Sequence, residues 1–335
     1  MSYVLSVVVP SYNVEKYLDK CLTSFSDERF NGRLDVMVVN DGSSDSTPQI
    51  AQKYVDRFPM IFRLINKENG GHGSAVNTGI INAKGKYFRI VDGDDWVNTD
   101  NMARLLDILE NTDTDMVVDE KREVDMLSGN TEFFPLPDSI EFNKIYSFEE
   151  ICDKNDICTY IMLHTLSVKT ELLHENGIKL LEGIFYVDIE FIIKATVECK
   201  DIMFLDLEIY QYLVGNVNQS VSYQNYVKRY SHHDKVTHEL IDFATQKKLD
   251  SASLRRYLDR RICLLINTHM NISLIYNKDR KQGLSQAREF RKYLSEANPL
   301  YYASTKGRYN KSLILHYLGI DYDRLQNIKE KKDSL

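Results

Sequence analysis

Three aspartates occur within four residues of this chain, in the run Asp-Gly-Asp-Asp at 92–95. The run directly follows the apolar stretch 87–91, so it lies where a strand is expected to end. Carboxylates this close repel one another unless a cation lies among them. One or two carboxylates with open coordination positions suit Mg²⁺ or Mn²⁺ that also binds phosphate groups. The alternative is an acidic turn leading into the next helix.

The elements expected around this run form a repeating pattern. Four short apolar stretches favour strands buried on both faces, at 4–9, 36–39, 61–65 and 87–91. Polar or glycine-rich turns follow them, at 11–13, 40–45, 69–73 and 92–95, and the first three lead into helical patterns. Ligands bind at the carboxyl ends of strands in open parallel sheets. We therefore expect the four turns to line one crevice of an α/β domain.

The chain resembles the family 2 glycosyltransferases of the GT-A fold in four ordered segments. They are Val-Val-Val-Pro-Ser-Tyr-Asn (7–13), Val-Asn-Asp-Gly-Ser-Ser-Asp (39–45), Asn-Gly-Gly-His-Gly-Ser-Ala-Val-Asn-Thr-Gly (69–79) and Asp-Gly-Asp-Asp-Trp (92–96). Each is weak alone, but their order makes the signal strong. The resemblance covers roughly residues 1–222. It implies a Rossmann-like, mostly parallel sheet flanked by helices, in an inverting transferase that uses a nucleotide-diphosphate sugar and a divalent metal, Mn²⁺ or Mg²⁺.

The resemblance also implies residues that bind the donor. Pro10 and Tyr12 match positions that border the nucleotide base, and Asp41 matches a carboxylate that accepts a hydrogen bond from the base. A carboxylate acceptor suits the imide N–H of uracil, which favours a UDP-sugar. Asp92 matches a position near the ribose or metal, and Asp94 matches the metal ligand proper. An ordinary turn residue is the alternative for Tyr12, and a helix N-cap for Asp41.

One more position is implied to bind the nucleotide-sugar, and its neighbours have other expected roles. Asn77 matches the Asn of the family's Ala-Arg-Asn segment and is therefore also expected to contact the donor, but Val76 replaces the Arg. Neutralisation of the diphosphate must then rely more on the metal, backbone N–H groups or other side chains. Asp45 is the better candidate for the helix cap, while Asp95 and Trp96 are expected to shape and pack the acidic turn.

A downstream block, Phe-Tyr-Val-Asp-Ile-Glu-Phe (185–191), resembles the family's Tyr-Glu-Asp-x-x-Phe motif, with Val187 in the Glu position. The matching Asp188 would be the catalytic base. Direct displacement at the anomeric carbon needs a carboxylate opposite the departing diphosphate, to take the proton of the acceptor hydroxyl. The metal at Asp94 would neutralise the leaving group. The alternatives are that Asp188 caps a helix, or that Glu190 is the base.

The remaining sequence carries fewer signals. Residues 116–170 are expected to form strands and loops on the acceptor side, with 133–137 as a loop or edge element because of its prolines. Strands are predicted at 202–205 and 209–213, followed by a segment, 216–222, that resembles a family loop ending in Ser-Val-Ser. The five cysteines are scattered and odd in number, which indicates reduced thiols.

Length and charge suggest two regions, a catalytic domain at 1–222 and a basic, mainly helical region at 223–335. Residues 246–335 contain 19 Lys+Arg and 9 Asp+Glu, a balance of +10, and the overall −7 then leaves −17 for 1–245. A basic helical region could meet an anionic membrane surface, a lipid-phosphate or polymer acceptor, an acidic partner or another copy of the chain. The alternative is a solvated helical face that packs on the catalytic domain. No nucleic-acid-binding motif is present.

Location and processivity follow from what the sequence lacks. There is no run of ~18 apolar residues and no signal peptide pattern, so we expect a cytoplasmic protein, with peripheral contact at the inner face of the membrane left open. Processive synthases of the family carry Gln-x-x-Arg-Trp, and the single tryptophan here, Trp96, is not in such a segment. The histidines at 232, 233 and 238 invite a metal interpretation, but surface or interface histidines are more common.

The sequence therefore predicts a metal-dependent glycosyltransferase. It would move a sugar from a UDP-sugar to a hydroxyl of a glycan, lipid-linked or polymer acceptor in cell-surface polysaccharide synthesis. A nucleotidyltransferase would need a glycine-rich, basic N-terminal loop, which residues 10–13 do not provide. A non-catalytic partner of another transferase or of a glycan is favoured by Val76 and Val187, whereas the retained aspartates oppose it.

Overall fold

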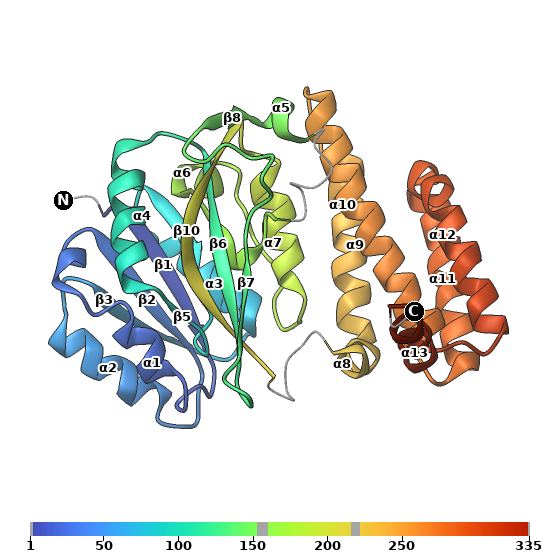
Figure 1. Ribbon diagram of the computed structural model, residues 1–335, viewed down its shortest axis with the longest axis horizontal. Coiled ribbons are helices and arrows are strands. Elements are labelled where there is room, and N and C mark those ends of the chain that lie inside the picture. The colour runs from blue at the N-terminus through green and yellow to red at the C-terminus, as the bar shows by residue number, and fades with distance from the viewer. Residues whose placement is uncertain (1–2, 153–159, 216–221, 334–335) are drawn as a thin grey trace. The chain divides into compact units, whose positions relative to one another are not determined.

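The computed structural model describes residues 3–152, 160–215 and 222–333. The chain divides into two compact units, Met1–Val217 and Asn218–Leu335 (Figure 1). The predicted loop at 216–222 lies outside the described residues except for Ser222, which caps the first helix of the second unit by accepting from the Asn225 N–H.

The N-terminal unit is built on one ten-stranded sheet, in the order β3-β2-β1-β4-β9-β6-β10-β5, with β7 on β6 and β8 on β10. Its strands are β1 (Leu5–Ser11), β2 (Leu34–Asp41), β3 (Phe62–Lys67), β4 (Tyr87–Ile90), β5 (Trp96–Val97), β6 (Met116–Asp125), β7 (Thr131–Phe134), β8 (Ile145–Ser147), β9 (Leu166–Lys169) and β10 (Asp201–Val214). The four predicted N-terminal strands are present, and β1 pairs in parallel with β2 and β4, as β2 does with β3. Every residue of β1 and β2 is buried, as expected for a parallel sheet covered on both faces.

Helices of this unit lie on both faces of the sheet (Figure 1). They are α1 (Leu18–Thr23), α2 (Thr47–Arg57), α3 (His72–Asn82), α4 (Thr99–Asn111), α5 (Phe148–Cys152), α6 (Thr170–Glu175) and α7 (Val187–Thr196), with short helical turns η1 (Glu28–Phe30) and η3 (Leu163–Thr165). Alternate residues of β1 and β2 join α1 and α4 in one hydrophobic core. On the other face α3 packs on β1, and Phe191 of α7 contacts Phe88 of β4 with ring centroids 6.0 Å apart. The predicted fold class is thereby confirmed.

The last part of the sheet differs in one respect from the prediction of two strands at 202–205 and 209–213. A single strand, β10, runs through both, with register shifts against β6 between Phe204 and Glu208 and between Glu208 and Tyr210. A bulge of this kind lets a strand bend without ending, and it increases the local twist. The residues after the bulge, 210–213, are those that reach the acidic turn. Residues 133 and 134 of the predicted loop or edge element belong to β7, which pairs with β6 off the main path of the sheet.

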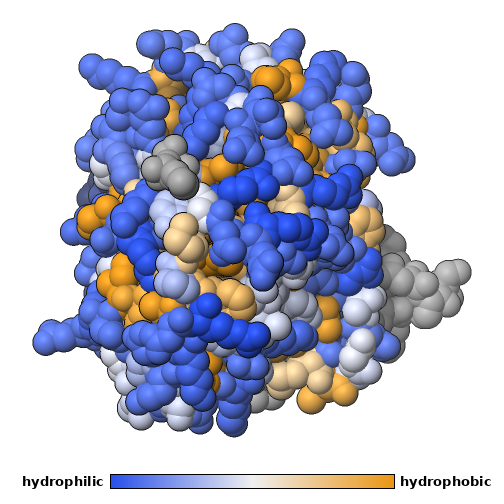
Figure 2. Space-filling model, turned by 90° about the vertical axis from the view of Figure 1, so that its left-hand side faces the viewer, coloured by the Kyte–Doolittle hydropathy of each residue, from blue (hydrophilic) through white to orange (hydrophobic). Residues whose placement is uncertain are grey.

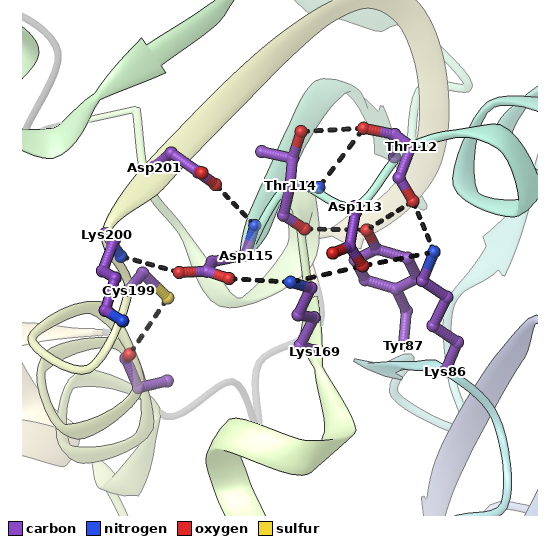
Figure 3. Close-up of polar contacts among 11 residues, drawn as sticks. Lys86, Tyr87, Thr112, Asp113, Thr114, Asp115, Lys169, Cys199, Lys200 and Asp201 are labelled. Atoms are coloured by element: carbon purple, nitrogen blue, oxygen red, sulfur yellow. Dashed lines mark hydrogen bonds and ion pairs between the residues drawn. The ribbon is translucent and has the colours of Figure 1, made fainter.

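A polar network lies at the amino end of β4 (Figure 3). The acidic turn follows the other end of this strand. Lys169 contacts Asp113 and Asp115 at 3.4 and 3.0 Å, and the second Asp115 oxygen accepts from the Lys200 N–H at 2.8 Å. The Tyr87 hydroxyl donates to the Thr114 carbonyl at 2.7 Å. These contacts join the ends of β4, β6, β9 and β10, and the lysine charge is balanced within the network.

The C-terminal unit is helical, as predicted. Its elements are α8 (Tyr223–Lys228), α9 (Tyr230–Gln246), α10 (Ala252–Asn271), the π-helical turn η4 (Ile272–Tyr276), α11 (Arg280–Ala297), α12 (Pro299–Tyr317) and α13 (Tyr322–Asp333). Buried apolar residues of α9 and α10, among them Leu240 and Ile262, lie in its interior. Among the described helices, none is long and apolar enough to span a membrane. The four described cysteines, 21, 152, 199 and 263, are free thiols.

The surface gives no sign of one large apolar region on the face that Figure 2 shows. That face is mostly hydrophilic, and its hydrophobic residues form small, separate groups. Scattered apolar side chains of this kind are normal on soluble domains.

Candidate active site

The acidic turn is held from two sides. Its Gly93 lies against the first turn of the chain, where an added Cβ would lie 3.1 Å from the Pro10 carbonyl oxygen, so glycine permits this close approach. Asp95 is buried, and its two carboxylate oxygens accept from the Tyr210 hydroxyl at 2.5 Å and from the Leu213 N–H at 2.7 Å. Asp95 therefore fixes the turn to β10, which confirms its predicted structural role.

Asp92 has a different environment. His72, the first residue of α3, places Nε2 3.0 Å from Asp92 Oδ1. Burial alone would lower the pKa of His72, but the hydrogen bond to Asp92 and the charges of Asp92, Asp188 and Asp94 outweigh it and raise this pKa to about 9. At neutral pH the pair is an imidazolium bonded to a carboxylate, close to the carboxyl end of β4.

Within residues 3–152, 160–215 and 222–333, the side chains of Asp94 and Asp188 make no hydrogen bond to another residue. Burial and the neighbouring Asp92 raise the pKa of Asp94 to about 6. Burial also raises the pKa of Asp188, while the charge of His72 lowers it and that of Asp92 raises it. Asp188 thus lies within electrostatic reach of His72 and Asp92, although it follows them in the chain by 116 and 96 residues (188 − 72 and 188 − 92).

The position of Asp188 depends on the segment 180–187 that precedes it. Asn77 of α3 donates to the Leu180 carbonyl at 2.9 Å and accepts from the Leu180 N–H at 2.8 Å, and it also donates to Glu182. Gly73 lies so close to the Leu181 carbonyl that an added Cβ would be 2.1 Å from its oxygen. Helix α7 then starts after Tyr186, whose φ of 71° is in the left-handed region. Backbone strain of this kind persists only where surrounding contacts enforce it.

Glu190, the alternative candidate for the catalytic base, is already bonded to other groups of the protein. It is fully buried, contacts Lys194 Nζ at 2.7 Å and accepts from the Leu181 N–H at 3.0 Å. Val187 and Val76, the two departures from the family pattern, are also buried. Between the two carboxylates, the geometry favours Asp188 as the one available to a substrate.

The first two turns lie together. Asn13, with φ of 53°, accepts from the Ser44 N–H at 2.9 Å, and its own N–H donates to the Ser43 hydroxyl. Tyr12, next to it, is 53% exposed, whereas Pro10 is buried in β1. Asp45 accepts from the Thr47 N–H at 3.0 Å at the start of α2, but the N-cap residue is Ser46, so the expected cap lies one residue before the cap position.

Asp41 and Asn77 have structural contacts that the sequence did not predict. Asp41 is buried and accepts from Lys67 Nζ at 2.7 Å and from the N–H groups of Gly70 and Gly71 at 2.9 and 2.7 Å. It thus holds the glycine-rich turn in place, just as Asn77 holds the segment after residue 180. Contact of either residue with a donor nucleotide stays a prediction.

His164, from η3, was missed by the sequence reasoning, as was His72. Ligand atoms of Asp92, Asp95 and His164 all lie within 4.8 Å of one another, and this is the one such metal-binding group among the described residues. Spacing of this order and a donor set of oxygen and nitrogen fit one divalent cation. His72 lies within the segment 69–79 that resembles the family, so the sequence contained a signal for it. His164 lies in a stretch without motifs, so the sequence contained no such signal.

The C-terminal histidines do not form a comparable group in the described part of the chain. His233 and His269 instead place their Nδ1 atoms 3.1 Å apart, and His269 Nε2 lies 3.1 Å from Asp234. A metal site there, one of the two interpretations of the sequence, gains no support.

Comparison with known proteins agrees with this architecture. The model of the family described as "Glycosyl transferase family 2" matches residues 6–175, and the chain belongs to this family. The matched region includes the acidic turn and ends before Asp188.

Two relatives illustrate the range of the similarity. EpsJ of Bacillus subtilis, described as an uncharacterized glycosyltransferase, is 29% identical over 62% of this chain and 60% of its own length. The poly(ribitol-phosphate) beta-N-acetylglucosaminyltransferase TarS of Staphylococcus aureus is 26% identical over 65% of this chain and 36% of its own length. This chain thus spans less than two thirds of the length of either relative.

A crystal structure of S. aureus TarS 1-349 in complex with UDP-GlcNAc has the same fold. It covers 95% of this chain and 93% of that one, with a TM-score of 0.67 and 21% sequence identity. Similarity at this level establishes a shared GT-A architecture.

Proposed function

We propose that this protein is an inverting, metal-dependent glycosyltransferase that moves a sugar from a UDP-sugar to a hydroxyl acceptor. The observation that carries the proposal is the convergence of Asp188 with Asp92, Asp94 and His72 from three separate elements. Family membership and the binding of UDP-GlcNAc by TarS support the choice of donor class.

The chain's own residues would divide the work as follows. Asp92 and Asp94 would hold Mn²⁺ or Mg²⁺, which when bound supplies positive charge to the diphosphate. The exposed ring of Tyr12, beside Pro10, would pack on the uracil base. Asp188 would accept the proton of the acceptor hydroxyl as that oxygen attacks the anomeric carbon, since its carboxylate has no committed partner and burial makes it more basic.

His72 offers a second source of positive charge. The family's Arg is replaced by buried Val76, and His72 lies four residues earlier on the same helix. Its imidazolium, held by Asp92, is placed to offset negative charge near the carboxyl end of β4.

For the acceptor and the cellular location, we propose only a chemical class and a compartment. TarS is named as a poly(ribitol-phosphate) transferase, which supports a glycan, lipid-linked or polymer acceptor for this chain. We place the reaction in the cytoplasm, with one sugar transferred per encounter, and assign 1–222 to catalysis. The positive balance of residues 246–335 is consistent with contact to an anionic acceptor or membrane surface, or with self-association.

Calorimetric titration with UDP and GDP, each with and without Mn²⁺, tests the donor site. We expect UDP to bind only with Mn²⁺ and more tightly than GDP, because Asp41 or its neighbours would accept the uracil imide N–H. If neither nucleotide binds under any condition, the enzymatic proposal is wrong and a non-catalytic partner role is favoured.

Two variants separate binding from chemistry. Asp94→Asn should abolish Mn²⁺-dependent UDP binding, whereas Asp188→Asn should bind UDP normally and lose transfer by roughly 10²–10⁴-fold. Asp113→Asn is the matched control, because Asp113 is exposed and lies at the amino end of the sheet. Equal loss of UDP affinity in the Asp94 and Asp188 variants would contradict the assigned roles.

A further inference from the structure

We propose that His164 is a nitrogen ligand of the cation in this site, coordinating beside Asp92, and that it biases the site toward Mn²⁺ over Mg²⁺. The inference rests on the proposed function, because it assumes a metal-dependent donor site.

The first argument is the position of His164. One of its ring nitrogens lies within 4.8 Å of carboxylate oxygens of Asp92 and Asp95. Both oxygens of Asp95 already accept hydrogen bonds, from Tyr210 and Leu213, so Asp95 is the weaker candidate of the three. Asp92 and His164 are therefore the two residues of this group that can coordinate a cation. Asp94, the other proposed ligand, lies two residues after Asp92 in the turn.

The second argument is that, in the part of the chain that the structure describes, the imidazole has no hydrogen-bond partner. Nδ1 of His164 is buried without a partner, and no other contact of either ring nitrogen with a hydrogen-bonding group is found among the described residues. A buried polar atom without a partner is unfavourable, and an ion absent from the coordinates is one of its ordinary explanations. His72, the other histidine beside Asp92, already has Nε2 on Asp92 Oδ1.

The third argument is that the ring is held in a fixed place by other groups. Tyr210 and Tyr212 lie against it with ring centroids 4.8 and 4.5 Å away. The His164 carbonyl accepts from Arg89 Nη2 at 2.6 Å, and fully buried Arg89 is itself paired with Asp119 of β6. A ligand that is oriented before binding loses little conformational entropy when a metal binds.

The ligand set determines the metal preference. Mg²⁺ favours oxygen ligands and retains water, whereas imidazole nitrogen is better tolerated by Mn²⁺ and later transition metals. A site of two carboxylates alone would distinguish the two ions less. With His164 present, we expect tighter UDP binding with Mn²⁺ than with Mg²⁺.

Electron spin echo envelope modulation of the full chain with MnCl₂ and UDP tests the inference directly. Nitrogen bonded to Mn²⁺ gives ¹⁴N modulation, and protein labelled with ¹⁵N-histidine should lose it, which assigns the signal to histidine. The modulation should also vanish in His164→Gln but persist in His72→Gln and in His174→Gln, whose imidazole contacts the distant Ile80 carbonyl. His164→Gln should weaken Mn²⁺ affinity by about tenfold or more and reduce the preference over Mg²⁺.

The outcomes separate this inference from the proposed function. Mn²⁺-dependent UDP binding without histidine modulation, or with modulation that survives His164→Gln, overturns the role of His164 and leaves the proposed function standing. Absence of Mn²⁺-dependent nucleotide binding overturns both. If His164→Gln does not fold, the labelled wild-type protein still decides whether histidine is a ligand, and His72→Gln decides whether it is His72.

Discussion

Three aspartates of one short turn have three environments. Asp95 is buried and bonded to β10, Asp92 is bonded to His72, and Asp94 has no partner among the described residues. Burial and the charges of Asp94 and Asp92 raise the pKa of Asp95 well above its usual range. The residue type alone could not distinguish these roles, because each depends on groups far away in the sequence.

Tyr210→Phe tests the role of Asp95. The change removes the donor to Asp95 Oδ2 and should lower the free energy of unfolding of the N-terminal unit by about 1–3 kcal/mol, since a buried acceptor is left unpaired. Trp96 is the single tryptophan, so its fluorescence during urea unfolding reports on this unit.

Tyr212→Phe is the matched control, because Tyr212 also packs on His164 but its hydroxyl makes no hydrogen bond in the described part of the chain. We expect it to change stability by less than about 0.5 kcal/mol. Similar losses in the two variants would show that the hydrogen bond to Asp95 does not set the effect, because both changes keep the aromatic ring.

At the scale of elements, the sequence predicted the strands and turns that local residue patterns determine. The β-branched runs gave β1 and β2, and the polar turns after them lie at the carboxyl ends of strands, as expected. The continuous β10 and the position of η3 could not be predicted, because a bulge and a buried Arg89–Asp119 pair depend on long-range pairing. His164 was missed for this reason.

The link between α3 and α7 carries the next prediction. Asn77→Ala removes the donor and acceptor that hold Leu180, so backbone groups of a buried residue lose their partners at a cost of about 1–3 kcal/mol. Because Asp188 follows this segment, amides of 180–188 should exchange faster with deuterium and transfer should slow.

Asn82→Ala is the control for Asn77→Ala. Asn82 lies at the end of the same helix, but its exposed amide bonds only to the Thr78 carbonyl within α3. Unchanged exchange of 180–188 in Asn77→Ala would show that the other contacts, such as those of Gly183 with Gly70 and of Leu181 with Glu190, hold the segment without Asn77.

At the scale of the whole molecule, the two units have different chemistry. Residues 1–245 carry the balance of −17 and include the acidic site, whereas residues 246–335 carry +10. The C-terminal unit also buries two histidines against each other, His233 and His269, with rings stacked at 5.2 Å. Burial and the charge of His269 lower the pKa of His233, and burial lowers that of His269 against the opposing effect of Asp234.

The sign of the pH effect on the C-terminal unit follows from these shifts. The folded-state pKa of each histidine lies below its ordinary value, so the unfolded chain binds more protons as pH falls below about 6.5. The stability associated with the neutral pair is complete above that pH and is lost as pH falls toward the folded-state pKa. Tyr230, His238 and Asp234 also face the pair, and Asp234 remains ionised in this range because its pKa is lowered.

The final prediction is that His233→Asn flattens this dependence. Between about pH 7.5 and about pH 5.5, the wild-type C-terminal unit should lose up to about 1.4 kcal/mol per pH unit for each histidine that takes up a proton on unfolding. The variant should be less stable at the higher pH, because it loses the stacked ring, but it should lose less on acidification. Deuterium exchange of α9 and α10, corrected for the intrinsic pH effect, measures this without interference from the other unit. An equally steep loss of stability in the variant would show that His233 takes up no proton on unfolding, or that other groups set the pH dependence. His233 would then have no part in the acid sensitivity of the unit.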